Sequence, residues 1–397
     1  MSLTSLADRR TPGRPIEITF DPELGLPSAT QTVLLIGHRG AGAASGDGSV
    51  ADYEVREIVS SGDPDAAQEE AEDLFGVGSE LANMVVAAVK ANEGENYPPL
   101  KVCCLANGDT GFGTSDVALT NIKRVEAEFV VSPYTGSDAT TRDKLKDACE
   151  AMSGAERVEN NQYGTVGVVF NRSVTSPASL AAPDTQFLMA VWMPDTGSPT
   201  YSIGEMAAAS AARVASLPVP FNPRDNVTIK GVEAPEDPAE WITVGLGLES
   251  ESALDKGWTP LKVKPNGEVA FVRSVTTRIT VDGVVEATAY YDVQDFMVLY
   301  YFRRAVYSRL NQSDLKAVKA SVETAKLVRS EIIRLMQLFE DNGMFQVVDK
   351  LAPLVQVERS DSDRHRFDVA IPVNVIPGLH VIATNIKAGV LYDSFTI

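Results

Sequence analysis

The residues with the clearest potential for chemistry form a glycine-rich segment that follows an apolar run. Residues 32–36 read TVLLI, and residues 37–48 read GHRGAGAASGDG. Glycines placed after a buried strand can let backbone N–H groups surround a phosphate. However, the glycines at 37, 40 and 42 are spaced G-x-x-G-x-G rather than G-x-G-x-x-G, and no G-K-[ST] follows them. A nucleotide-binding α/β enzyme that uses loop 37–48 therefore stays open as an alternative, beside a flexible connection or a turn into a neighbouring subunit.

Other residue types that bind metals or act as nucleophiles are scattered along the chain. The histidines are His38, His365 and His380, and none has a second His or a Cys at metal-ligand spacing. The cysteines are Cys103, Cys104 and Cys149, without a C-x-x-C pair, so we expect buried free thiols rather than disulfides or a zinc site. No G-x-S-x-G motif is present. The sequence thus predicts no catalytic residue, no metal and no cofactor.

Length and charge restrict the class of protein further. A chain of 397 residues can bury a large core and corresponds to two or three domains. Its net charge of −19 argues against a nucleic-acid binder, because there is no surplus of cations to displace the counterions of phosphates. No apolar run reaches the roughly 20 residues that span a bilayer, and residues 1–20 do not read as a signal peptide. We therefore expect no membrane insertion and a protein that stays in the cytosol where it is made.

Apolar runs alternate with amphipathic segments through the first half of the chain. Strands are expected at 32–36, 100–105, 128–131, 165–170 and 186–192. Helices are expected at 65–90, divided near 75–79, and at 141–152 and 205–215. Strand, helix and strand in succession predict an α/β core with parallel pairing. With the antiparallel strands expected later, the whole chain reads as mixed α/β (α+β), with sheets flanked by helices.

A proline-rich stretch marks the expected inner boundary. Residues 218–238 contain five prolines, which favours an extended connection. We therefore expect an N-terminal extended arm at 1–30, an α/β domain at 31–217, a connection at 218–240, a C-terminal α/β domain at 241–378 and a C-terminal extended arm at 379–397.

The second domain is expected to begin with a three-stranded antiparallel meander. Its turns are Asn266-Gly267 and Asp282-Gly283, each between β-branched runs. Arg273 shares a face of the middle strand with apolar residues, so this arginine needs a partner. Helices are expected at 293–310 and 322–339, the second stopped by Asn342-Gly343, followed by strands at 353–357 and 365–373.

Both ends of the chain carry apolar strands that turns separate from the body. Ile16, Ile18 and Phe20 alternate with polar residues, and Asp21-Pro22 then breaks the strand. The last apolar run, from 379 to 392, includes Val381, Ile382, Ile386, Val390 and Tyr392. An isolated strand has free N–H and C=O groups that favour pairing with another sheet, although pairing within its own chain stays open.

Five segments carry a resemblance that extends over nearly the whole chain. They are LLIGHRGAGAASG at 34–46, LFGVGSELANMVVAA at 74–88, EMAAASAARVASLPVPFNPRDNVTIKGV at 205–232, the stretch 258–309 with R-x-x-T-T at 273–277, and VERSDSDRHRFDVAIPVNVIPGLHVIATNI at 357–386. In this order they resemble contractile tail sheath proteins, specifically the shorter Mu-like type.

The resemblance implies a structural subunit rather than an enzyme. Such subunits form hexameric rings stacked helically around an inner tube, and the sheath contracts to drive the tube through a cell envelope without a cofactor. The expected partners are further copies of the chain, the tail tube protein, and baseplate and tail terminator proteins. The expected location is the virion tail, assembled in the cytoplasm of a bacterial host, although a sheath from another contractile injection system shares this fold. Residues 16–20 and 381–392 then correspond to the arms that link neighbouring subunits.

A basic window interrupts this acidic chain. Residues 303–334 contain eight cations and three anions, which gives +5. Resemblance places the C-terminal domain of a sheath protein at the inner wall, so we expect Lys319, Lys326, Arg329 and Arg334 to face the tube. The alternative is that these cations neutralise acidic groups of the same or a neighbouring sheath subunit.

Overall fold

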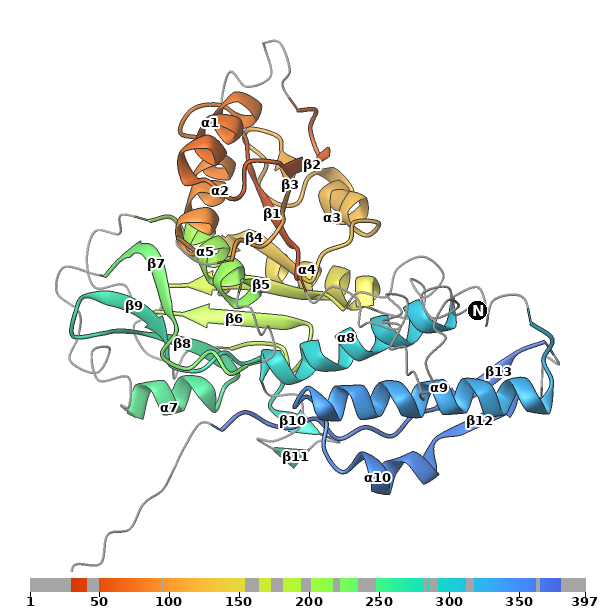
Figure 1. Ribbon diagram of the computed structural model, residues 1–397. Coiled ribbons are helices and arrows are strands. Elements are labelled where there is room, and N and C mark those ends of the chain that lie inside the picture. Colours follow the sequence, from red (N-terminus) through yellow and green to blue (C-terminus); the bar gives the residue numbers. More distant parts are fainter. Residues whose placement is uncertain are drawn as a thin grey trace, which may run out of the picture.

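The centre of the protein is a nine-stranded sheet whose middle strands run parallel (Figure 1). This computed structural model describes residues 30–40, 50–93, 96–153, 164–172, 181–193, 201–216, 222–234, 248–281, 284–285, 292–311, 318–361 and 365–379. The strands are β1 (Val33–His38), β2 (Val55–Ile58), β3 (Leu100–Leu105), β4 (Phe129–Thr135), β5 (Val166–Asn171), β6 (Leu188–Trp192), β7 (Thr228–Glu233), β8 (Trp258–Val263) and β9 (Glu268–Phe271), in the spatial order β2-β3-β1-β4-β5-β6-β8-β9-β7. The pairs from β3 through β8 are parallel, whereas β2, β9 and β7 join antiparallel at the two edges. The mixed α/β fold class expected from the sequence is confirmed.

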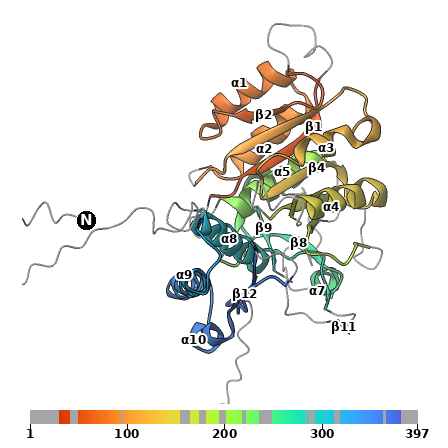
Figure 2. The same ribbon diagram turned by 90° about the vertical axis from the view of Figure 1, so that its right-hand side faces the viewer.

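Helices cover both faces of this sheet (Figure 2). They are α1 (Pro64–Phe75), α2 (Glu80–Lys90), α3 (Val117–Ile122), α4 (Ala139–Ser153), α5 (Ile203–Ala215) and α7 (Leu248–Leu254), with a short 3₁₀ turn at Thr114–Asp116. The alternating side chains of β1 explain the two layers, because successive residues of a strand point to opposite faces. Val33 and Leu35 pack with α2 and α5, whereas Leu34 and Ile36 pack with α3 and α4. β1 is therefore buried on both faces, as its continuous apolar run predicts.

The first two helices show how local residues set the boundaries. Asp63 begins α1 by accepting hydrogen bonds from the amides of residues 65 and 66, and Ser79 begins α2 in the same way through the amide of residue 82. Between the helices, Gly76 and Gly78 adopt positive φ angles of 94° and 67°, which other residues rarely adopt. The expected division of segment 65–90 near 75–79 is confirmed.

A C-terminal unit, defined here as α8 (Val293–Leu310), α9 (Val322–Asp341), α10 (Val348–Leu351), the 3₁₀ turn Ala352–Leu354, β12 (Gln356–Arg359) and β13 (Phe367–Ala370), lies beside the sheet (Figure 1). The expected helices at 293–310 and 322–339 are confirmed. The start of α8 belongs to the main core through Phe296 and Met297. The following turns pack through Phe302 and Ala305 against α9 in a separate core. One helix is thus shared by two hydrophobic cores.

The expected three-stranded meander is wrong. β8 and β9 do form a hairpin around Gly267, whose φ is 85°. However, β9 ends at Phe271 and has β7 as its other neighbour, while residues 280–285 form a separate small sheet of β10 (Thr280–Val281) and β11 (Val284–Val285). The intervening residues contact several other segments: Ser274 donates to Gln294 of α8 at 2.9 Å, and Thr277 donates to the carbonyl oxygen of Thr185 at 3.0 Å. Arg273 makes a bidentate pair with Asp292 at 2.8 and 2.8 Å, which confirms that this arginine needs a partner.

The sheet also crosses the expected inner boundary. β7 lies inside the proline-rich segment 218–240, and β8, which follows that segment, pairs in parallel with β6, which precedes it. The division into domains at 31–217 and 241–378 stays a prediction. The main sheet nevertheless draws strands from both sides of the proline-rich segment.

Candidate functional site

The glycine-rich segment begins at the carboxyl end of β1, the place where open α/β sheets bind ligands. Residues 41–48 of this segment lie outside the described residues, so only its start is visible. There, the Glu80 carboxylate accepts hydrogen bonds from the backbone N–H of His38 at 3.1 Å and from its ring. The hydrogen bond to Glu80 raises the pKa of His38. Glu80 lies in the first turn of α2, and the described geometry, in which His38 binds this carboxylate, gives the nucleotide alternative no support.

The remaining candidates for chemistry are inert or absent in the described part of the chain. Cys103, Cys104 and Cys149 are buried free thiols, as expected. Burial raises the pKa of Cys103 to about 12 and that of Cys104 to about 11. Across the described ranges, no group of three or more His, Cys, Asp or Glu side chains is arranged to hold a metal ion. No described helix has the length and apolar character needed to span a bilayer.

The small sheet of the C-terminal unit consists of the two strands β12 and β13. β12 and β13 pair antiparallel in register from Gln356 with Ala370 to Arg359 with Phe367. Within the described ranges they pair with no third strand, and most of their side chains are exposed or half-buried. Each outer edge can therefore offer backbone N–H and C=O groups to an added strand.

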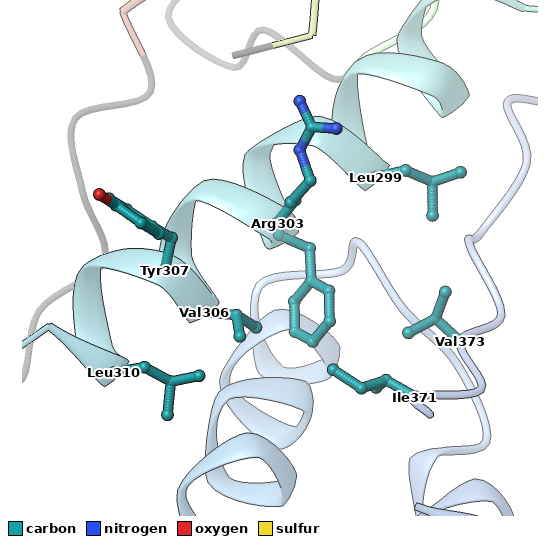
Figure 3. Close-up of a pocket in the computed structure, with 8 residues that line it drawn as sticks. Leu299, Arg303, Val306, Tyr307, Leu310, Ile371 and Val373 are labelled. Carbon is teal, nitrogen blue, oxygen red and sulfur yellow. The ribbon is translucent and has the colours of Figure 1, made fainter. Parts of the chain in front are cut away.

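An apolar groove lies next to this sheet, between α8 and the residues that follow β13 (Figure 3). Its volume is about 370 Å³. The lining residues are Leu299, Phe302, Arg303, Val306, Tyr307 and Leu310 from α8, and Ile371 and Val373 from the segment after β13. An extended peptide that paired near β13 could place apolar side chains in this groove. The sequence did not reveal it, because its two walls are distant in the chain.

The residues predicted to form inter-subunit arms belong to the two ends of the chain. Ile16, Ile18 and Phe20 lie outside the described residues, as do Val381, Ile382, Ile386, Val390 and Tyr392. Their pairing stays a prediction. Leu379, the last described residue before the C-terminal segment, is 74% exposed.

The basic window divides into arginines held within the chain and exposed lysines. Arg329 donates to the carbonyl oxygens of Val355 at 2.9 Å and Ala352 at 2.8 Å, so it stabilises the turn before β12. Arg334 pairs with Glu331 at 3.0 Å. Although partial burial of Glu331 opposes it, hydrogen bonds from Arg309 and Arg334 hold the pKa of Glu331 below its usual value. Arg334 thus has an anionic partner within the chain, and whether it also faces a tube stays a prediction.

The two lysines among the four predicted tube-facing cations lie on the surface of the described chain. Lys319 and Lys326 are exposed, and neither makes an ion pair with a described residue. Two residues of α9 near these lysines in the sequence are exposed apolar side chains, Leu327 at 44% and Val322 at 66%. Whether this face contacts a tube stays a prediction.

The docking site of α8 is a further feature that the sequence did not reveal. Tyr300 packs directly on Gly164, where an added Cβ would lie 1.5 Å from the ring. Arg304 lies 3.5 Å from the buried carboxylate of Glu128. Glu128 directly precedes an apolar run, and this was the one available sign of a buried charge.

Comparisons with known proteins address the fold. No family model matches the sequence, and no curated protein matches it. A sheath tail protein from Listeria innocua is 12% identical with a TM-score of 0.61, covering 88% of this chain and 92% of its own. A sheath tail protein from Desulfitobacterium hafniense is 11% identical with a TM-score of 0.55, covering 87% and 93%. A chain of the anti-feeding prophage baseplate is 14% identical with a TM-score of 0.62, covering 96% and 100%. The fold of this chain is the fold of sheath tail proteins, as the sequence resemblance implied, whereas the Mu-like type stays a prediction.

Proposed function

We propose that this chain is the structural subunit of a contractile tail sheath. Copies polymerise as stacked hexameric rings around an inner tube, and the assembly contracts to drive the tube through the envelope of a target cell. The observation that carries the proposal is the exposed β12–β13 sheet beside an apolar groove, in a chain with the fold of sheath tail proteins. One similar chain comes from the anti-feeding prophage baseplate in its contracted state.

The terminal strands are the proposed links between copies. In an extended conformation, alternation would place Ile16, Ile18 and Phe20 on one face, which suits an added strand with one apolar side. Pairing at an edge of the β12–β13 sheet supplies main-chain hydrogen bonds, and each Ile or Phe that enters the groove contributes about 1.5–3 kcal/mol. Residues 381–392 supply the second arm. Such links persist while the rigid bodies that they connect change their relative positions.

Contraction needs two packings of one subunit with different interface energies and a barrier between them. The exposed lysines at 319 and 326 provide the proposed contact with the tube, in the extended packing. Individually, exposed ion pairs contribute on the order of 0–1 kcal/mol, so many repeated contacts hold the sheath and can still be released. Baseplate and tail terminator proteins complete the two ends, and the assembly functions in a virion tail or a related injection apparatus.

Negative-stain microscopy of the purified full-length chain tests this function. We expect rods or rings, and uniform small particles would contradict the sheath. Replacing Ile16, Ile18 and Phe20 by serine should leave a folded protein that forms no rods. A matched variant with serine at Glu17 and Thr19 should assemble normally, because these side chains lie on the opposite face. Rods of normal length from the triple variant would exclude the N-terminal arm as the link.

A second test addresses the groove. Val306→Ser and Ile371→Ser together remove apolar surface from its two walls and should lower the yield of rods in the same way. Glycine-to-alanine changes at 40 and 42 address the alternative enzyme. If the native chain bound a nucleotide at micromolar concentration and these changes abolished binding, the nucleotide function would replace the structural one.

A further inference from the structure

The contact between α8 and the main sheet contains a buried acid that the assembly function does not use. One face of α8 presents Tyr300, Arg303 and Arg304 to residues at the end of α4 and at the amino ends of β4 and β5. Arg303 donates to the backbone carbonyl of Ser153 at 2.8 Å, at the end of α4. Arg304 faces Glu128, which directly precedes β4. This contact, together with the shared apolar core, attaches the C-terminal unit to the sheet.

Glu128 is a buried acid with few favourable contacts. Its side chain is 8% exposed. One carboxylate oxygen accepts a hydrogen bond of 2.6 Å from the backbone N–H of Thr32, and the other lies 3.5 Å from Arg304, at the outer limit of a hydrogen bond. The charged groups that face it are Arg304 from α8, which attracts it, and the exposed Glu126 from its own segment, which repels it.

The balance of these effects favours the protonated acid. Burial raises the pKa of Glu128 to about 7 from an ordinary value of 4.5, and it outweighs the hydrogen bond from Thr32 and the attraction of Arg304, which both act in the opposite direction. If α8 leaves the sheet, Glu128 meets water and its pKa returns towards the ordinary value. The docked state therefore binds a proton more tightly than the undocked state. Docking is strengthened as the pH falls through 7 and weakened as the pH rises through it.

We propose that Glu128 makes the docking of α8 on the sheet proton-dependent, so that the C-terminal unit is held more firmly on the acidic side of neutrality than on the alkaline side. One consequence rests on the proposed function. In a sheath, the pH at assembly would set how firmly the main sheet of each subunit is attached to its C-terminal unit.

Hydrogen exchange of the unassembled full-length chain tests the proposal. Because only isolated subunits are measured, the outcome does not depend on whether rods form. After correction for the intrinsic exchange rate, the protection of the α8 amides should fall by about tenfold between pH 6 and pH 8. This factor follows from a pKa of Glu128 of about 7 in the docked state and of 4.5 in the undocked state. Glu128→Gln keeps an acceptor for the amide of Thr32 but cannot ionise, so its protection should not change with pH. Glu126→Gln removes the same charge two residues away and should keep the fall.

A second variant covers the case in which Glu128→Gln does not fold. Arg304→Met removes the attraction that favours the carboxylate, so the fall in protection should move to higher pH. The proposal is overturned if the protection of wild-type α8 is equal at pH 6 and pH 8. It is also overturned if Glu128→Gln shows the same fall in protection, or if protection in Arg304→Met falls at the same pH as in the wild type.

Discussion

Replacing Gly164 by alanine should weaken the packing of α8 on the sheet and destabilise the chain. An ideal Cβ at this position lies 1.5 Å from Cδ2 of Tyr300 and 1.7 Å from its Cγ. Carbon atoms in contact are separated by about 3.5–4 Å, so the ring must retreat by roughly 2 Å. It has little freedom to do so, because its centroid lies 4.3 Å from that of Phe296 and the guanidinium of Arg303 lies 4.8 Å from the ring.

The cost follows from the packing of the ring. Overpacking a core costs about 1–3 kcal/mol, and we expect the upper end here because the colliding atoms belong to a ring fixed on both sides. Urea unfolding followed by circular dichroism should give a free energy of unfolding lower by about 3 kcal/mol. Gly62→Ala is the matched control, since a Cβ at this exposed glycine meets no atom within 4 Å.

A double-mutant cycle separates the collision from other effects of the alanine. Tyr300→Ala removes the ring, so adding Gly164→Ala to it should cost little further stability. The coupling energy between the two changes should then be on the order of 2 kcal/mol. If Gly164→Ala is neutral, or if its cost is undiminished in the Tyr300→Ala background, the proposed packing of Tyr300 on Gly164 is refuted.

Three further predictions concern separate parts of the chain. Asp292→Asn should lower the free energy of unfolding by roughly 3 kcal/mol, because it leaves Arg273 half-buried without its carboxylate; calorimetry would test this, with a smaller loss expected when Arg273→Met is added. Val347→Asn should stabilise the chain by about 1 kcal/mol, since the valine has a φ of 55° that a β-branched residue adopts only with strain; an unchanged or lower midpoint in urea would contradict it. Lys319→Glu with Lys326→Glu should preserve sheath self-assembly and abolish co-assembly with tube protein in electron micrographs; normal packing around tubes would place the docking surface elsewhere.

Elements bounded by clear local signals could be predicted from the sequence. The apolar run at 100–105 coincides with β3, and the helix expected at 293–310 coincides with α8. The error at the meander has a physical cause. Residues 272–279 alternate as a strand does, but the polar side chains of Ser274, Thr276 and Thr277 are buried through contacts with other segments. Alternation of side chains along the sequence indicates which of them are buried. It does not indicate whether the backbone pairs in a sheet.

The surfaces proposed for assembly depended on tertiary contacts and could be predicted only in part. The isolated terminal strands were visible as patterns, but the groove that could receive them joins α8 to residues after β13. From the sequence, Arg329 and Arg334 are predicted to face the tube, because the sequence does not show which carbonyl or carboxylate contacts each guanidinium. The structure distinguishes Lys319 and Lys326 from Arg329, because it shows that Arg329 contacts the turn before β12.

The shared position of α8 constrains how any rearrangement of subunits can occur. Its first turns are buried in the core of the main sheet, and its later turns are buried against α9, Phe339 and Phe345. A hinge within α8 would expose one of these cores and break the backbone hydrogen bonds of a continuous helix, so bending there is strongly opposed. The sheet and the C-terminal unit therefore move together while α8 stays docked. Under the proposed sheath function, the change of position would then be taken up by the connections between copies, or by release of the α8 contact at Gly164 and Glu128, which is the contact that protonation is proposed to strengthen.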